Sequence, residues 1–138
     1  MPVVEFHLVE GSLDADQRRR LFAEGSARYA EVLDSPVERI RALVTLRPPE
    51  SVAIGGVPVA ETGAEAVYVT ALMLQGRPVE QAQAALRALT DLVVEVLGVA
   101  RDGVRARVVR VPPEEWAIGG EPAAAVRAQE VQARSGPA

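Results

Sequence analysis

The sequence predicts an α+β fold in which two β-α-β units form one four-stranded sheet with two helices on one face. Three observations predict this fold: the chain repeats itself once, each half reads strand, helix, strand, and the composition is globular. The 138 residues are 49% hydrophobic and 25% charged. This length and balance suit one domain, residues 1–138, with a substantial apolar core.

The internal repeat is clearest in two proline- and glycine-rich segments. The segment Pro48–Gly56 reads PPESVAIGG, and Pro112–Gly120 reads PPEEWAIGG, so seven of nine residues are identical. Self-similarity of this kind indicates duplicated structural units. We therefore divide the domain into pseudo-repeats at residues 2–57 and 67–121, followed by a C-terminal tail at residues 122–138.

In the first half, Val3–Val9 alternates as a β-strand does, and Asp14 can cap the helix that follows. The strand Ile40–Leu46 completes the unit. Six residues of the helix fall on one face and are expected to be buried: Leu21, Phe22, Gly25, Tyr29, Val32 and Leu33.

The second half repeats this pattern, with strands at Ala66–Leu74 and Val104–Val111. Pro78 suits the first turn of the intervening helix, and Gly98 ends it. The expected buried stripe of this helix is Ala82, Leu86, Leu89, Val93, Val96 and Leu97.

Two β-α-β units with both helices on one side leave the other face of the sheet open. Because the strands are rich in Val, Leu and Ile, we expect this face to be apolar and to drive assembly into a homo-oligomer. The two Pro-Pro-Glu…Ile-Gly-Gly segments are expected to form hairpins or arms that contact a neighbouring chain. The tail is expected to form a short helix and to fray over its last four residues.

Composition excludes several classes of function. The chain has no cysteine and one histidine, His7, so we expect no disulfide and no metal site. The net charge of −4, with the two signs interspersed, gives no reason to expect nucleic acid or a membrane as a partner. No apolar run approaches 18 residues, and the first residues do not resemble a signal peptide. We therefore expect a cytoplasmic protein.

Pro2 is the residue with the most distinctive chemistry. Removal of Met1 would leave a secondary amine at the head of the first strand. An α-amino group ordinarily titrates near pH ~8, and burial or nearby arginines would lower its pKa towards the value that a general base needs. A small second residue is also common in proteins without any such role. Pro2 therefore indicates a catalytic amine only together with other motifs.

Those other motifs occur in both halves. The first half has Pro2, Val-Glu-Gly11, Arg41 and an Ile-Gly-Gly, and the second has Leu-Gln-Gly-Arg77, Arg105 and Trp116-Ala-Ile-Gly-Gly. Over residues 2–121 the chain resembles the tautomerase superfamily. Each half is similar to a 4-oxalocrotonate tautomerase unit, and the two-unit chain is similar to the longer trimeric members, including cis-3-chloroacrylic acid dehalogenase, malonate semialdehyde decarboxylase and macrophage migration inhibitory factor.

The resemblance implies a division of labour between the halves. The first half carries Pro2 but has Ser12 and Val52 where the family has an arginine and an aromatic residue; the second half keeps those two as Arg77 and Trp116. The resemblance thus implies one site per chain, with Pro2 as general base and Trp116 shielding it from water.

The resemblance also implies how a substrate binds. Arg77, with Arg41 or Arg105 from a neighbouring chain, would hold a small anionic substrate. The implied reaction is keto-enol proton transfer on an unsaturated 2-keto or 2-hydroxy acid, without a metal or an organic cofactor, in a trimer.

Several alternatives stay open at this point. A hydratase or dehalogenase is less favoured, because Leu74 stands where those enzymes have a second arginine and neither Glu114 nor Glu115 is clearly the water-activating acid. The aspartate of a decarboxylase has no convincing match here, although Asp34 and Glu38 lie in that region. A non-catalytic binding trimer remains the alternative outside enzymes, especially if Met1 is retained. Strand-end arginines are often merely solvated, and we expect His7 and Tyr29 to be structural.

Overall fold

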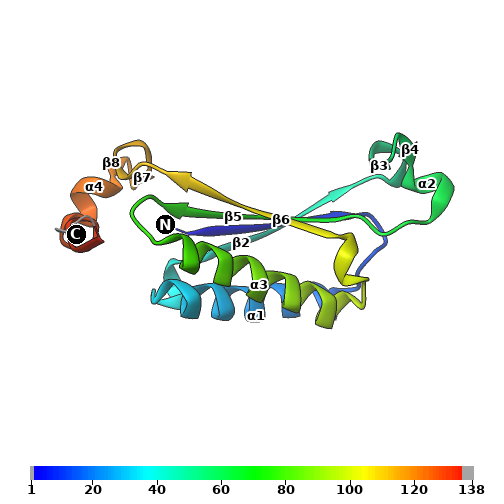
Figure 1. Ribbon diagram of the computed structural model, residues 1–138, viewed down its shortest axis with the longest axis horizontal. Coiled ribbons are helices and arrows are strands. Elements are labelled where there is room, and N and C mark those ends of the chain that lie inside the picture. The colour runs from blue at the N-terminus through cyan, green and yellow to red at the C-terminus, as the bar shows by residue number, and fades with distance from the viewer. Residues whose placement is uncertain (1, 135–138) are drawn as a thin grey trace.

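The computed structural model describes residues 2–134, so the expectations for Met1 and for residues 135–138 lie outside the described residues. The main sheet has the order β2-β1-β5-β6, and α1 and α3 both lie against one of its faces (Figure 1). The element bounds are β1 Val3–Val9, α1 Ala15–Leu33, β2 Arg41–Arg47, β5 Val67–Leu74, α3 Val79–Leu97 and β6 Val104–Val111. The predicted α+β class, with two β-α-β units and both helices on one face, is confirmed.

Each half ends in a hairpin that projects from the side of the sheet away from the helices, one at each end of the molecule (Figure 1). Short 3₁₀ turns precede the strands or hairpins at Val37–Arg39, Pro49–Ser51, Arg101–Gly103 and Pro113–Glu115. The hairpins and the segments that follow them are β3 Ala53–Ile54, β4 Val57–Pro58, α2 Val59–Thr62, β7 Ala117–Ile118, β8 Glu121–Pro122, α4 Ala123–Val126 and α5 Ala128–Arg134.

The pairing of strands decides which residues meet at each end of the sheet. Within each half the two strands are parallel, β1 with β2 and β5 with β6. The halves join through antiparallel pairing of β1 with β5, in which Val3 lies opposite Leu72. The start of β1 therefore lies beside the end of β5, and residues 2 and 77, far apart in sequence, come to one edge.

The helices begin and end where the sequence indicates. Asp14 caps α1 in a reciprocal capping box with Gln17, and Asp34 ends it in the left-handed conformation. Pro78 precedes α3, and Gly98 ends it with φ of 69°. A glycine suits that conformation because it has no Cβ to clash.

The core lies between the sheet and the two helices. Alternate residues of β1, Val4, Phe6 and Leu8, point towards the helices and are buried. Gly25 of α1 permits close packing, since a Cβ there would lie 3.1 Å from Cζ of Phe6. The largest fully buried side chains of the helices are Leu21, Tyr29, Leu33, Leu89, Leu92 and Val93.

The buried faces of the helices differ in detail from the predicted stripes. Phe22 is 37% exposed, so its predicted burial is wrong; it lies about 100° around the helix from Leu21, whose row with Gly25 and Tyr29 faces the core. In α3, Leu92 is fully buried, whereas Leu86 and Leu97 are only half-buried. Ala85, Leu89 and Leu92 form one fully buried row of this helix.

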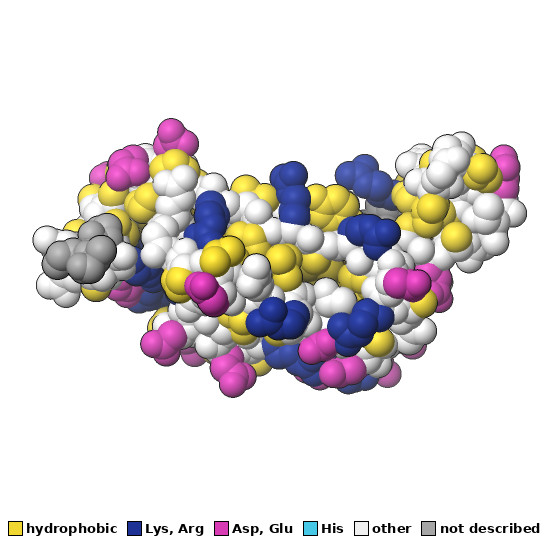
Figure 2. Space-filling view, in the orientation of Figure 1, with side chains coloured by type: hydrophobic (Ala, Val, Ile, Leu, Met, Phe, Trp, Pro, Cys, Tyr) yellow, Lys and Arg dark blue, Asp and Glu magenta, His cyan; other side chains and the backbone are white. Residues whose placement is uncertain are grey.

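The open face of the sheet is more polar than expected. Hydrophobic and basic side chains are mixed on the side of the sheet away from the helices (Figure 2). Leu43 and Tyr68 are exposed there, at 48% and 40%. Strand alternation divides the Val and Leu residues between the two faces, and the open face carries Glu5, His7, Thr45, Thr70, Arg105 and Arg107 as well.

Within residues 2–134, no helix is both long and apolar enough to cross a membrane.

We predict that Leu92→Ala lowers the free energy of unfolding by about 2–5 kcal/mol, because it leaves a cavity between α3, α1 and the sheet. Val79→Ala is the matched control, since Val79 is 57% exposed at the start of the same helix, and its effect should stay within about 0.5 kcal/mol. Urea denaturation at one fixed protein concentration measures both. Equal losses in the two variants would contradict this assignment of the core.

Candidate functional site

Pro2 is buried although it stands at the beginning of the chain. Its carbonyl oxygen accepts a hydrogen bond from the backbone N–H of Arg41, at 3.0 Å, which ties it to the neighbouring strand β2. It lines a small recess of about 20 Å³ at the edge where β1 begins and β5 ends. The other residues that line this recess, which we call the Pro2 recess, are Ser35, Arg39, Leu74, Arg77, Arg127, Glu130 and Arg134.

Arg77 reaches the Pro2 recess from the turn after β5 and is half-buried. Its Nη1 donates to the carbonyl oxygen of Leu33, at 2.7 Å, and to Oε1 of Gln81, at 3.2 Å. The side chain thus satisfies a carbonyl at the C-terminal end of α1, where a cation is favourable. Both hydrogen bonds use Nη1, so the other guanidinium nitrogens can be offered to an anion.

The Pro2 recess carries a strong excess of positive charge. Four arginines line it, Arg39, Arg77, Arg127 and Arg134, against the single carboxylate of Glu130. Burial, and next the charge of Arg134, lower the pKa of Arg77. Cations brought together in this way repel one another, and a bound anion would relieve the repulsion.

The two strand arginines lie at opposite ends of the sheet. Arg41 is exposed beside Pro2 in the β1–β2 pairing, and its Nη1 donates to the carbonyl oxygen of Glu38 at 3.0 Å. Arg105 pairs with Tyr68 at the start of β5, four residues from Leu72, or about 13 Å along the strand from the Pro2 edge. Within one chain, Arg105 therefore does not meet Pro2.

Trp116 lies between the turn Pro113–Glu115 and β7, in the arm at the Pro2 end of the molecule (Figure 1). It is half-buried, and its carbonyl accepts the N–H of Ala123 at 2.6 Å. Its indole Nε1 is buried and has no hydrogen-bond partner among residues 2–134. The residue does not line the Pro2 recess of its own chain.

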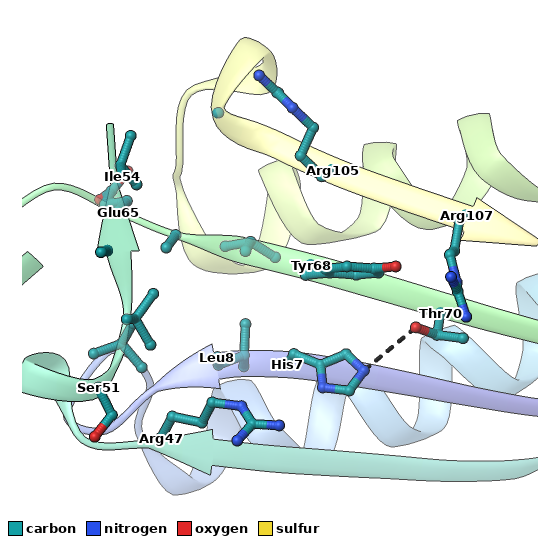
Figure 3. Close-up of a pocket in the computed structure, with 16 residues that line it drawn as sticks. His7, Leu8, Arg47, Ser51, Ile54, Glu65, Tyr68, Thr70, Arg105 and Arg107 are labelled. Carbon is teal, nitrogen blue, oxygen red and sulfur yellow. Dashed lines mark hydrogen bonds between the residues drawn. The ribbon is translucent and has the colours of Figure 1, made fainter. Parts of the chain in front are cut away.

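A larger recess of about 820 Å³ lies over the open face of the sheet, between the strands and the first arm (Figure 3). Arg47, Tyr68, Arg105 and Arg107 line it with His7, whose Nε2 lies 3.3 Å from Oγ1 of Thr70. Neither Pro2 nor Arg77 contributes to it. Because the proposed base and Arg77 meet elsewhere, we take the Pro2 recess as the candidate site in spite of its small volume.

Tyr29 lies in the core, as expected. Its hydroxyl donates to the carbonyl oxygen of Leu72, at 2.8 Å, and burial raises its pKa. The hydroxyl therefore stays protonated and supports the end of β5 near the Pro2 recess.

Sequence reasoning missed Arg39 and the tail residues Arg127, Glu130 and Arg134. The signal in the sequence was local: Glu130 and Arg134 have the i, i+4 spacing of a helical ion pair, and their side chains lie 3.9 Å apart. Nothing in that spacing shows where the helix packs. It packs through Arg39, whose Nη1 donates to both carboxylate oxygens of Glu130 at 2.9 Å.

Comparison with known proteins agrees with this architecture. The family described as "Tautomerase enzyme" matches the chain twice, over residues 2–62 and 68–125. The 2-hydroxymuconate tautomerases of Pseudomonas sp. (strain CF600) and Pseudomonas putida are 38% and 36% identical over 58 residues, which is 42% of this chain and 90% of each relative.

Solved structures are similar over most of the chain. A native fused 4-OT superposes with a TM-score of 0.85 and 25% identity, covering 91% of this chain and 98% of that one. The macrophage migration inhibitory factor of Toxoplasma gondii shares the fold, with a TM-score of 0.73 and 15% identity over 87% of this chain and 98% of that one. Two family matches that together span most of the sequence decide the assignment: this chain belongs to the tautomerase family of enzymes.

Proposed function

We propose that the protein is a tautomerase that uses the amino group of Pro2, freed by removal of Met1, as the general base for keto-enol proton transfer. The substrate class is a small unsaturated 2-keto or 2-hydroxy acid. The observation that carries this proposal is the Pro2 recess, in which buried Pro2 and half-buried Arg77 line one cavity with three further arginines. The relatives named 2-hydroxymuconate tautomerases support the same substrate class.

The chemistry follows from the charges around Pro2. The free secondary amine takes the proton of the 2-hydroxyl group, and the electron pair left on oxygen delocalises as a dienolate. Arg77 stabilises this developing charge and holds the adjacent carboxylate. The ammonium form of Pro2 then returns the proton to a carbon of the substrate. Nearby arginines favour the neutral amine at the start of this cycle.

Arg41 or Arg105, together with Trp116, completes the proposed site from a neighbouring chain. Arg41 is exposed at the Pro2 edge, and Arg105 is exposed at the far end of the sheet, so each can face another subunit. The partnerless indole N–H of Trp116 also suits a contact outside the described chain. We propose a trimer, in which the open sheet faces of three chains cover one another.

A test of the base is Pro2→Ala, which still allows removal of Met1 but replaces the ring amine by a primary amine. We predict that kcat/KM for ketonisation of 2-hydroxymuconate falls by about 10²–10⁴-fold, the usual contribution of a general base. Intact mass spectrometry of both proteins must first show that Met1 is absent. A Pro2→Ala protein with full activity, or an active parent protein that retains Met1, would reject the mechanism.

A test of the division between the halves compares Arg77→Ala with Ser12→Ala, the corresponding position of the first half. Arg77→Ala should lower kcat/KM by about 10²–10³-fold, because a charge-assisted contact to the anionic substrate is lost. Ser12→Ala should stay within about twofold. Because Arg77 also binds the end of α1, circular dichroism must show that the variant is folded at the assay temperature. Equal effects of the two substitutions would contradict the assignment.

A test of the assembly is light scattering on the eluting peak of a size-exclusion column. The proposed trimer predicts a mass three times the 14.7 kDa of one chain. The reason is that the open face, with Leu43 and Tyr68 exposed, is stabilised by burial against other copies. A monomeric peak with full tautomerase activity would show that the site needs no neighbouring chain.

A further inference from the structure

The C-terminal helix α5 is the part of the Pro2 recess that lies beyond the family match, which ends at residue 125. Glu130 and Arg134 of this helix, and Arg127 directly before it, line the recess together with Pro2 and Arg77. The tail therefore brings charge to a site that the two repeated units already form.

An ion pair joins the helix to the first half. Nη1 of Arg39 donates to both carboxylate oxygens of Glu130, and the side chains are 28% and 41% exposed. The hydrogen bond from Arg39 lowers the pKa of Glu130, so the carboxylate is charged at neutral pH. A partly exposed pair of this kind is weak enough to open and close.

Arg134 is seated directly beside the turn that carries Arg77. Its Cβ would lie 3.3 Å, and its Cδ 3.9 Å, from a Cβ at Gly76. Gly76 has φ of 104° and no side chain, so the aliphatic part of the Arg134 side chain packs against the backbone at Gly76. The guanidinium of Arg134 is consequently close enough for its charge to depress the pKa of Arg77.

The charges of the recess do not balance without a ligand. Glu130 binds Arg39 at 2.9 Å and is 3.9 Å from Arg134, so the arginine that it chiefly neutralises is Arg39. The charges of Arg77, Arg127 and Arg134 are then left to bind a ligand. Arg77 can bind a carboxylate beside Pro2, and the other two can bind a second carboxylate. The cavity of about 20 Å³ has room for about one water molecule but not for a substrate of the proposed class, so the recess must widen before a substrate enters.

We propose that Arg134 is a specificity-determining residue that binds the second carboxylate of a dicarboxylate substrate, carried on a helix that the Arg39–Glu130 pair holds closed. This inference rests on the proposed function, since it concerns the same recess. It assigns the preference for dicarboxylates over monocarboxylates to the tail rather than to either β-α-β unit.

The experiment compares Arg134→Ala and Arg134→Lys with Arg19→Ala, a control arginine that is 76% exposed on α1 and does not line the recess. Each is assayed with 2-hydroxymuconate, a dicarboxylate, and phenylenolpyruvate, a monocarboxylate. Arg134→Ala should lower kcat/KM for the dicarboxylate by about 10–100-fold, mainly through KM, and leave the monocarboxylate within about twofold. Arg134→Lys should recover part of the loss, and Arg19→Ala should change neither substrate.

A binding measurement separates this inference from the proposed function. Calorimetry with adipate and hexanoate, saturated six-carbon acids, should show weaker binding of adipate alone in Arg134→Ala. If the parent protein catalyses neither reaction but adipate binding depends on Arg134, the tautomerase proposal fails and the carboxylate site stands. If both substrates are turned over and Arg134→Ala affects them equally or not at all, the role of Arg134 is overturned.

Discussion

The antiparallel pairing of β1 with β5 is the constraint on which the candidate site depends. Each half is a parallel β-α-β unit, and taken alone it would carry either Pro2 or Arg77 but not both. The pairing of Val3 with Leu72 brings the first residues of one half to the end of the first strand of the other. A slip of the register by one residue would turn every side chain of β1 to the opposite face, so burial of Val4, Phe6 and Leu8 also fixes the position of Pro2.

The side chains at this edge of the sheet carry more positive than negative charge. Arg77 satisfies the carbonyl end of α1, Arg39 binds Glu130, and Arg127 and Arg134 share that same carboxylate, so four arginines meet one glutamate. Such an arrangement costs stability unless an anion binds or the neighbouring amine is neutral. In the proposed function, the same cations attract an anionic keto acid and favour the neutral, basic form of Pro2. Substrate binding and proton transfer then depend on the same charges.

The fold could be predicted from the sequence because its signals are periodic and occur twice. Alternation marks the strands, Asp14 and Gly98 mark helix ends, and the repeat requires the two halves to be alike. The face of each helix was less well predicted, as Phe22 and Leu92 show, because the close contact at Gly25 depends on tertiary packing. The open face carries more polar residues than the Val- and Leu-rich strands suggested.

The candidate site was predictable only in part. Pro2 and Arg77 stand in motifs, whereas α5 reaches the Pro2 recess through an ion pair between residues 91 positions apart. Local spacing predicts a helix in the tail but contains no information on such a contact. Similarly, the sequence could not show that Arg41 and Arg105 lie at opposite ends of the sheet, which follows from the strand order.

We propose that the nitrogen of Pro2 is a free amine whose charge is controlled by the arginines around it. The most direct test of this proposal is nuclear magnetic resonance of ¹⁵N-labelled Pro2 as a function of pH, in the parent protein and in Arg77→Ala, beside a peptide of the same first residues. The account predicts that the pKa of the amine lies below that of the peptide and rises when Arg77 is removed. A nitrogen that does not titrate, or one with the pKa of the peptide in both proteins, would contradict it.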